Sequence, residues 1–231
     1  AVPEENLEEI AAMVSSYPEV NHNYQREHHY NLWFVVAAPD EVALQRVLKE
    51  IEERSACRVL FLPLVEDYHI DLGFDMTGTR RKSASFVAAH TGAPSQPYSP
   101  SEDERRVIAA IQSGLPLVAR PYAAVGESLG LAEAVVIGCL QSLVRHGVIK
   151  RMGVVVRHHE LGYRANAMVV WDIPDEEISK LGHCLGKLEF VTLCYRRPRR
   201  LPVWRYNLFC MIHGHDREEV LARVEEMRQG C

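Results

Sequence analysis

The segment Tyr206-Asn207-Leu208-Phe209 repeats an earlier segment of the chain, Tyr30-Asn31-Leu32-Trp33, and this repeat decides the fold. Further upstream the match continues with one shift, because Tyr24 recurs as Tyr195 at an offset of 171 residues, whereas the Tyr-Asn-Leu segments lie 176 residues apart. Self-similarity over such a distance indicates two copies of one structural unit. The second copy therefore carries five extra residues between its two predicted middle strands, which indicates a lengthened hairpin loop.

Each copy has the alternation of strands and helices of a ferredoxin-like unit. In the second copy the hydrophobic periodicity predicts, in order, a strand over Asn166 to Trp171, a helix beginning near Pro174, strands over Phe190 to Tyr195 and Trp204 to His213, and a helix from about Asp216 to Met227. The first copy lacks the opening strand but continues into a predicted closing strand, Arg58 to Leu64. Together they predict βαββαβ, in which two helices cover one face of a four-stranded antiparallel sheet.

A linker and a third domain separate the copies. Ser, Thr, Ala, Gly and Pro dominate Thr77 to Pro100, which predicts a flexible linker. Ser101 and Glu104 have the spacing of a capping box, and two further helices and a strand-like segment follow. This order predicts a winged helix-turn-helix. The predicted class is α+β, with a first ferredoxin-like domain over 1–76, a linker over 77–100, a winged helix-turn-helix over 101–157 and a second ferredoxin-like domain over 158–231.

Length and composition exclude several protein classes. The chain has 231 residues, 47% of them hydrophobic and 25% charged, which is typical of a soluble globular protein, and no apolar run reaches the roughly 18 residues of a membrane helix. A formal charge of -5 argues against attraction of the whole chain to nucleic acid. The six cysteines lack zinc-site spacing, so buried reduced thiols are expected, and with no secretory leader at the start we expect a cytoplasmic protein.

A winged helix-turn-helix followed by a ferredoxin-like domain resembles the Lrp/AsnC family of transcription regulators. The resemblance covers Ser101 to Met227 and is carried by Leu129-Gly130-Leu131, Gly147-Val148-Ile149 and Leu161-Gly162-Tyr163. It implies DNA binding, yet no Lys or Arg occurs from Pro121 through Val144, where the recognition helix is predicted. Because DNA affinity rests on basic side chains, we expect a packing or dimerisation module without a nucleic-acid partner.

Where the sequence departs from that of the regulators, it resembles the siroheme decarboxylases. These are regulator-like enzymes that occur as paired or fused subunits. The departures are Arg26 to Phe34 in the first copy, and Cys194 to Pro198 with Trp204 to Phe209 in the second. The resemblance implies a carboxy-lyase that removes CO2 from two acetate side chains of siroheme, giving didecarboxysiroheme in heme biosynthesis. It also implies a pseudo-dimer of the two units, with a higher homo-oligomer left open.

The basic and aromatic residues of the second copy, together with His22 of the first, suit such a substrate. Siroheme carries eight carboxylates on a flat macrocycle, so its pocket needs apolar walls and cations that accept carboxylates in a fork. The predicted substrate-binding residues are His22, His158, Tyr195, Arg196, Arg197, Arg199, Arg200, Trp204 and Arg205. From the residues alone, a solvated basic loop is an equal alternative.

The first copy supplies the predicted catalytic residues. Loss of CO2 from an acetate leaves a carbanion equivalent that must be protonated, and histidine, with a reference pKa of about 6.5, suits the role of general acid. His28 fills the position that the resemblance gives to the functional histidine, and Arg26, His29 and Tyr30 complete the set. Because iron arrives inside the substrate, neither a protein-bound metal nor an organic cofactor is expected.

Two other functions remain open on the sequence. One is a transcription regulator that responds to heme or siroheme, which the uncharged recognition helix disfavours. The other is a sensor of amino acids or other small molecules, a ligand that would not require so many arginines.

Overall fold

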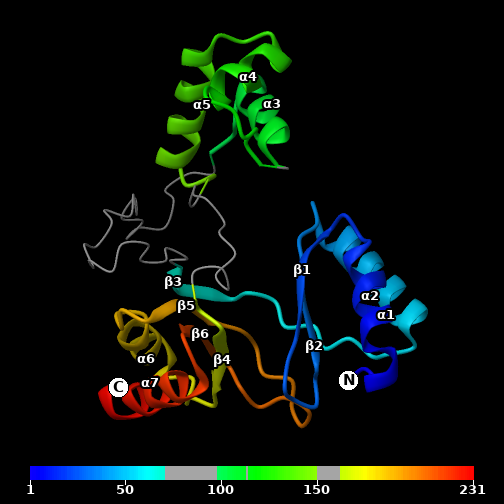
Figure 1. The fold of residues 1–231 in the computed structure, drawn as a ribbon, viewed down its shortest axis with the longest axis vertical. Coiled ribbons are helices and arrows are strands. Elements are labelled where there is room, and N and C mark those ends of the chain that lie inside the picture. Colours follow the sequence, from blue (N-terminus) through cyan, green and yellow to red (C-terminus); the bar gives the residue numbers. More distant parts are fainter. Residues whose placement is uncertain (71–97, 113, 150–161) are drawn as a thin grey trace. The chain divides into compact units, whose positions relative to one another are not determined.

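The structure is a computed structural model that describes residues 1–70, 98–112, 114–149 and 162–231 (Figure 1). It divides into two compact units: residues 1–66 with 197–207, and residues 67–196 with 208–231. The lengthened loop of the second copy therefore belongs to the same unit as the first copy. His158, the predicted wing and most of the predicted linker lie outside the described residues.

The first unit consists of two helices on a two-stranded antiparallel sheet. Its elements are a 3-10 turn over Glu4–Asn6, α1 (Leu7–Ser15), β1 (Val20–Gln25), β2 (Leu32–Val36) and α2 (Glu41–Ser55). The core joins Val14, Val47 and Ile51 of the helices to alternate residues of the sheet, among them Leu32 and Phe34. Side chains on a strand alternate between faces, so the residues between these point away from the helices.

The second unit contains a four-stranded sheet covered on one face by two helices. The strands are β3 (Glu66–Ile70), β4 (Ala165–Trp171), β5 (Val191–Arg196) and β6 (Leu208–Gly214), in the order β3-β5-β6-β4. Helices α6 (Ile178–Leu185) and α7 (Arg217–Gly230) contribute Ile178, Leu185, Val220 and Met227 to its core. Residues of β6 are buried along its whole length, as expected of a central strand. The ferredoxin-like arrangement predicted for this copy is confirmed.

The closing strand predicted over Arg58 to Leu64 is wrong in position and in partner. Residues 57–65 form a coil, here called the connecting coil, and the strand that follows, β3, joins the sheet of the second copy. Pro63 interrupts the apolar run and has no N–H to donate to a ladder. Tyr68 of β3 lies against Gly182 of α6, where even a methyl group would stand 2.2 Å from the ring.

The central region contains the predicted helix-turn-helix. Helices α3 (Glu102–Ile111), α4 (Pro121–Leu129) and α5 (Glu133–Arg145) enclose a core of Val107, Val125, Val136 and Leu140. The capping box of Ser101 and Glu104 is present, with hydrogen bonds in both directions. Among the described residues no single helix is long and apolar enough to cross a membrane, and α4 and α5, which meet that test only jointly, are bent by 102°.

The prediction that the cysteines are reduced is wrong for one pair. Cys184, at the end of α6, and Cys231 form a disulfide, because the fold brings positions 47 residues apart to a Cα–Cα distance of 6.1 Å. Cysteine spacing alone could not reveal this pairing. Cys194 and Cys210 are reduced and buried on neighbouring strands, where their mutual hydrogen bond and burial raise the pKa of Cys210.

Candidate active site

The predicted catalytic residues lie on the hairpin that joins β1 to β2. The hairpin closes through the Arg26 N–H, which donates to the carbonyl of Asn31 at 2.8 Å. The Asn31 side chain accepts a hydrogen bond from the N–H of Val2 and donates one to its carbonyl, each at 2.8 Å. This amide ties the hairpin to the chain before α1, so the repeated Tyr-Asn-Leu motif holds the local geometry of the site.

The face of the β1–β2 sheet that points away from the helices is aromatic and partly exposed. In the strand register, His22 faces Val35 and Tyr24 faces Trp33. The His22 and Tyr24 rings are 5.1 Å apart, and the Arg26 guanidinium lies 4.8 Å from the Tyr24 ring centre. Desolvation, and then the charge of Arg26, lower the pKa of His22. Because Tyr24 is 45% exposed, this face offers a flat aromatic surface beside a cation.

The lengthened loop of the second copy brings a buried tryptophan to this face. Arg200 and Trp204 exchange backbone hydrogen bonds of 2.7 and 2.8 Å, which fold the loop back on itself. In Figure 1 the orange segment between β5 and β6 extends to the β1–β2 ribbon. Trp204, 3% exposed, lies with its ring 5.2 to 5.8 Å from four others. We call this group the aromatic cluster: His28, Tyr30, Trp33, Trp204 and Tyr206.

Hydrogen bonds fix the orientation of His28 within the cluster. Its Nδ1 accepts from the N–H of Tyr30 at 3.0 Å, so the neutral ring carries its proton on Nε2. The His28 N–H donates to the carbonyl of Arg26 at 2.9 Å, and the Trp33 indole donates to the carbonyl of Tyr30 at 2.7 Å. His28 is exposed as a residue, and Nε2–H is the group of its neutral ring that can donate to a ligand.

The predicted substrate-binding arginines divide into distinct environments. In the first unit, the Arg197 guanidinium donates to the carbonyl of Leu62, and Nε of Arg200 donates to the carbonyl of Phe61 at 3.0 Å. Arg199 is half-buried and Arg205 exposed on the same loop.

Two predicted binding residues lie on β5 in the other unit. Tyr195 stacks on Phe209, with ring centres 5.7 Å apart, and its hydroxyl contacts Met168 Sδ at 3.6 Å. Arg196 lies 3.7 Å from Asp175.

The structure thus brings several predicted residues together and adds others. His28, Tyr30 and Trp204 share the aromatic cluster, the His29 ring contacts Tyr30 at 5.0 Å, and His22 and Arg26 lie around Tyr24. Three aromatic residues of the site were not among the predicted residues: Tyr24, Trp33 and Tyr206. Alternation along β1 and β2 could have identified Tyr24 and Trp33, since His22 points to the same face as Tyr24.

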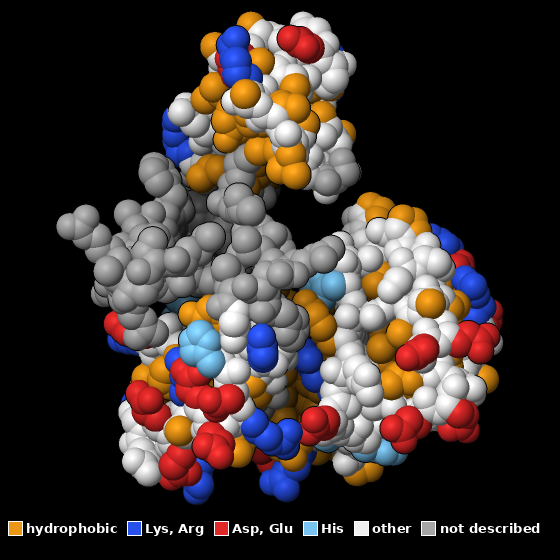
Figure 2. All heavy atoms as spheres, viewed as in Figure 1, with side chains coloured by type: hydrophobic (Ala, Val, Ile, Leu, Met, Phe, Trp, Pro, Cys, Tyr) orange, Lys and Arg blue, Asp and Glu red, His pale blue; other side chains and the backbone are white. Residues whose placement is uncertain are grey.

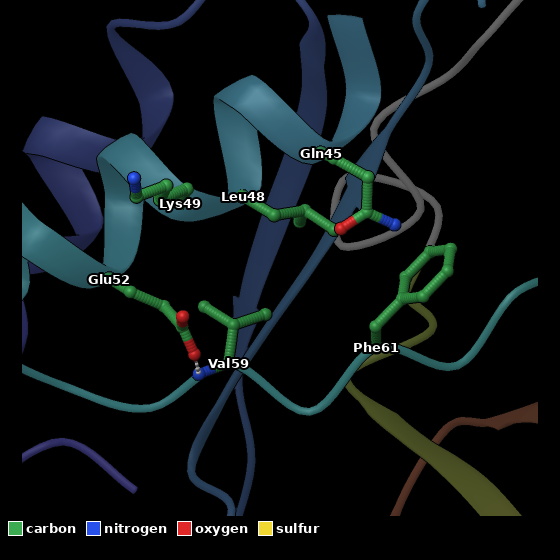
Figure 3. Close-up of a pocket in the computed structure, with 6 residues that line it drawn as sticks. All are labelled: Gln45, Leu48, Lys49, Glu52, Val59 and Phe61. Atoms are coloured by element: carbon green, nitrogen blue, oxygen red, sulfur yellow. Dashed lines mark hydrogen bonds between the residues drawn. The ribbon is translucent and has the colours of Figure 1, made fainter. Parts of the chain in front are cut away.

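A separate pocket beside α2 contains none of the predicted site residues. Its volume is about 330 Å³, and it is lined by Gln45, Leu48, Lys49, Glu52, Val59 and Phe61 (Figure 3). Glu52 Oε1 accepts a hydrogen bond from the N–H of Val59 at 2.6 Å, so one oxygen of this carboxylate is bound to the chain itself. No group of three or more potential metal ligands occurs in the described part of the chain.

The helix-turn-helix presents little of what DNA recognition requires. The exposed residues on the first turns of α5 are Ala134, Val135 and Gly138, and its one cation, Arg145, lies at the end of the helix. On the face drawn in Figure 2, this domain presents mainly hydrophobic and uncharged atoms. Along α5, a DNA phosphate would therefore meet a basic side chain only at Arg145.

Known proteins match the chain over nearly its whole length. Residues 1–69 and 160–231 match the family model of the AsnC-like ligand binding domain, and residues 104–150 match that of the siroheme decarboxylase NirDL-like HTH domain. The siroheme decarboxylase NirDL subunit of Paracoccus denitrificans is 40% identical over 98% of this chain and 68% of its own length. The siroheme decarboxylase of Hydrogenobacter thermophilus is 34% identical over 97% of this chain and 66% of its own length.

A crystal structure of siroheme decarboxylase NirDL in complex with an iron-uroporphyrin III analogue is also similar. It has 31% sequence identity and a TM-score of 0.64, over 98% of this chain and 63% of that one. The chain thus spans about two thirds of the length of these relatives. It belongs to the siroheme decarboxylase family, whose named members are carboxy-lyases.

Proposed function

We propose that this chain decarboxylates siroheme, removing CO2 from two acetate side chains to give didecarboxysiroheme in heme biosynthesis. The observation that carries the proposal is the aromatic cluster, in which Trp204 of the second copy packs against His28 and Tyr30 of the first. A general acid, aromatic walls and a run of arginines then belong to one unit. The names of the relatives, and the iron-uroporphyrin analogue bound to one of them, support the same substrate class.

The reaction requires one proton for each CO2 released. The bond between the acetate methylene and its carboxylate breaks, the electron pair moves towards the macrocycle, and a proton is added to leave a methyl group. We assign the delivery of this proton to Nε2 of His28 in its imidazolium form, because the Tyr30 N–H faces Nδ1; in that form Nδ1 also carries a proton, and the hydrogen bond from Tyr30 is given up. His29, beside Tyr30, remains a secondary candidate for the same step.

Charge and aromatic surface account for substrate binding in this proposal. Arg26, Arg199 and Arg205 are the cations assigned to substrate carboxylates, since arginine binds them in a fork. Tyr24, which is 45% exposed, supplies aromatic surface for the macrocycle, and the buried Trp204 packs against His28 and Tyr30. The iron belongs to the substrate, so the residues need only bind, orient and protonate.

Anaerobic incubation with siroheme, followed by mass spectrometry, tests the function. The product should lose about 44 mass units for each acetate decarboxylated. Replacing His28 by Ala should lower turnover by about 100- to 10,000-fold, the usual contribution of a general acid. The matched control is His183→Ala, an exposed histidine on α6. Wild-type protein that binds siroheme and leaves its mass unchanged would refute the function, and full turnover by His28→Ala would remove His28 from the mechanism.

We also propose a cytoplasmic protein that works without a protein-bound cofactor and assembles further as a homo-oligomer. The named subunits among the relatives support assembly. Light scattering after size exclusion, with and without iron-uroporphyrin III, tests it, and a single monomeric mass in both samples would contradict it.

A further inference from the structure

Two arginines of the lengthened loop bind the main chain of the connecting coil. The Arg197 guanidinium donates to the carbonyl of Leu62, and Arg200 Nε donates to that of Phe61. Both arginine side chains are partly buried, and both acceptor carbonyls belong to the connecting coil, residues 57–65. Hydrogen bonds from a charged donor are about twice as strong as neutral ones, so two adjacent bonds hold the coil firmly.

The connecting coil is anchored at its start as well. The N–H of Val59 donates to Glu52 Oε1 at 2.6 Å, and the N–H of Cys57 donates to Ser55 Oγ at 3.1 Å. Both acceptors belong to α2, whose buried face forms the core of the first unit. The coil is therefore a fixed support on the first unit, and the arginines attach the loop of the second copy to it.

This attachment continues to the candidate active site. Arg200 exchanges two backbone hydrogen bonds with Trp204, whose ring lies 5.7 Å from His28. A displacement of the loop at Arg200 would thus move the ring that packs against the proposed acid. Misplacement of about 1 Å can cost about 100-fold in rate.

We propose that Arg197 and Arg200 are positioning residues, which seat the loop on the connecting coil and so hold Trp204 against His28, rather than ligands of substrate carboxylates. The role in catalysis rests on the proposed decarboxylation. The seating of the loop does not, because it is a property of the substrate-free protein.

The test compares Arg197→Gln and Arg200→Gln with the wild type in the substrate-free protein. With 5-fluorotryptophan incorporated, the 19F resonance of Trp204, assigned through Trp204→Phe, should move towards its solvent-exposed position while that of Trp171 stays unchanged. Hydrogen exchange of the backbone N–H groups at positions 200 and 204 should accelerate at least tenfold in both variants. Arg58→Gln, at an exposed position of the connecting coil, is the control and should leave both signals in place. Arg200→Lys, which retains a donor, should recover at least half of the resonance shift.

Kinetics separate positioning from carboxylate binding. In Arg197→Gln and Arg200→Gln, kcat should fall about 10- to 100-fold, while the Kd for iron-uroporphyrin III changes less than about threefold. Loss of a direct charge-assisted bond to a carboxylate would instead raise that Kd about 10- to 100-fold. An unchanged Trp204 resonance and unchanged exchange in the substrate-free variants would overturn the proposal, and they do so even if the wild type shows no decarboxylation.

Discussion

The contact between Tyr68 of β3 and Gly182 of α6 allows a quantitative test of whether β3 packs on α6. A Cβ on Gly182 would lie 2.2 Å from Cδ2 and 2.7 Å from Cγ of the Tyr68 ring, the part of the side chain nearest the backbone. The ring has little room to yield, because it also packs against His183 at 5.1 Å. Alanine in a helix gains about 1 kcal/mol over glycine, whereas overpacking costs about 1–3 kcal/mol.

Because these effects oppose each other, the sign of the change in unfolding free energy caused by Gly182→Ala should depend on whether Tyr68 is present. Gly182→Ala should lower the free energy of unfolding by up to about 2 kcal/mol in the wild-type background. In a Tyr68→Ala background the clash is absent, so the same substitution should stabilise by up to about 1 kcal/mol. The two backgrounds should thus differ by a coupling of about 1–3 kcal/mol.

Urea unfolding, followed by far-ultraviolet circular dichroism and by tryptophan emission, measures all four proteins of this cycle. Equal m-values would show that the variants change stability rather than compactness. If Gly182→Ala were as stable as the wild type and showed no coupling to Tyr68, β3 would not lie on α6. The placement of β3, a strand of the first copy, in the sheet of the second copy would then be refuted.

Three further predictions concern single side chains. Tyr24→Ala should raise the Kd for iron-uroporphyrin III about 2- to 10-fold in an absorbance titration, because it removes an aromatic surface beside Arg26; an unchanged Kd would exclude Tyr24 from the site. The lowered pKa of His22 means that the folded state favours the neutral ring, so His22→Gln should lose less stability than the wild type as pH falls below about 6.5. Hydrogen bonds, the strongest from the Ser101 N–H, lower the pKa of Glu104 to about 2. The stability that ionised Glu104 contributes should therefore be present above pH 4.5 and disappear towards pH 2. If the unfolding free energy of Glu104→Gln followed the same pH dependence as that of the wild type, this prediction would be contradicted.

Local physical chemistry made much of the fold predictable. The strands of the second copy were expected within a few residues of β4, β5 and β6, because alternating and continuous apolar runs report burial directly. The capping box at Ser101 was readable for the same reason, since both of its partners lie within four residues. Tyr30 was identifiable because it belongs to the repeated motif, and His28 because it fills the position that the family resemblance gives to the functional histidine.

Contacts between distant parts of the chain were not predictable in this way. The closing strand was expected in the first copy, but its sheet partner is β5, and the glycine that admits it lies on α6, more than 100 residues later. The disulfide of Cys184 and Cys231 depends on the same long-range packing.

The sequence by itself determined the repeated units, their helices and strands, and the types of residue that could bind and protonate a polyanionic macrocycle, because these follow from side-chain chemistry and local periodicity. Only the tertiary structure decided which residues share a site. It placed Trp204 beside His28 and directed Arg197 and Arg200 to backbone carbonyls. The physical reason is that a guanidinium can donate to a carbonyl as well as to a carboxylate, and only the three-dimensional position of the acceptor selects between them.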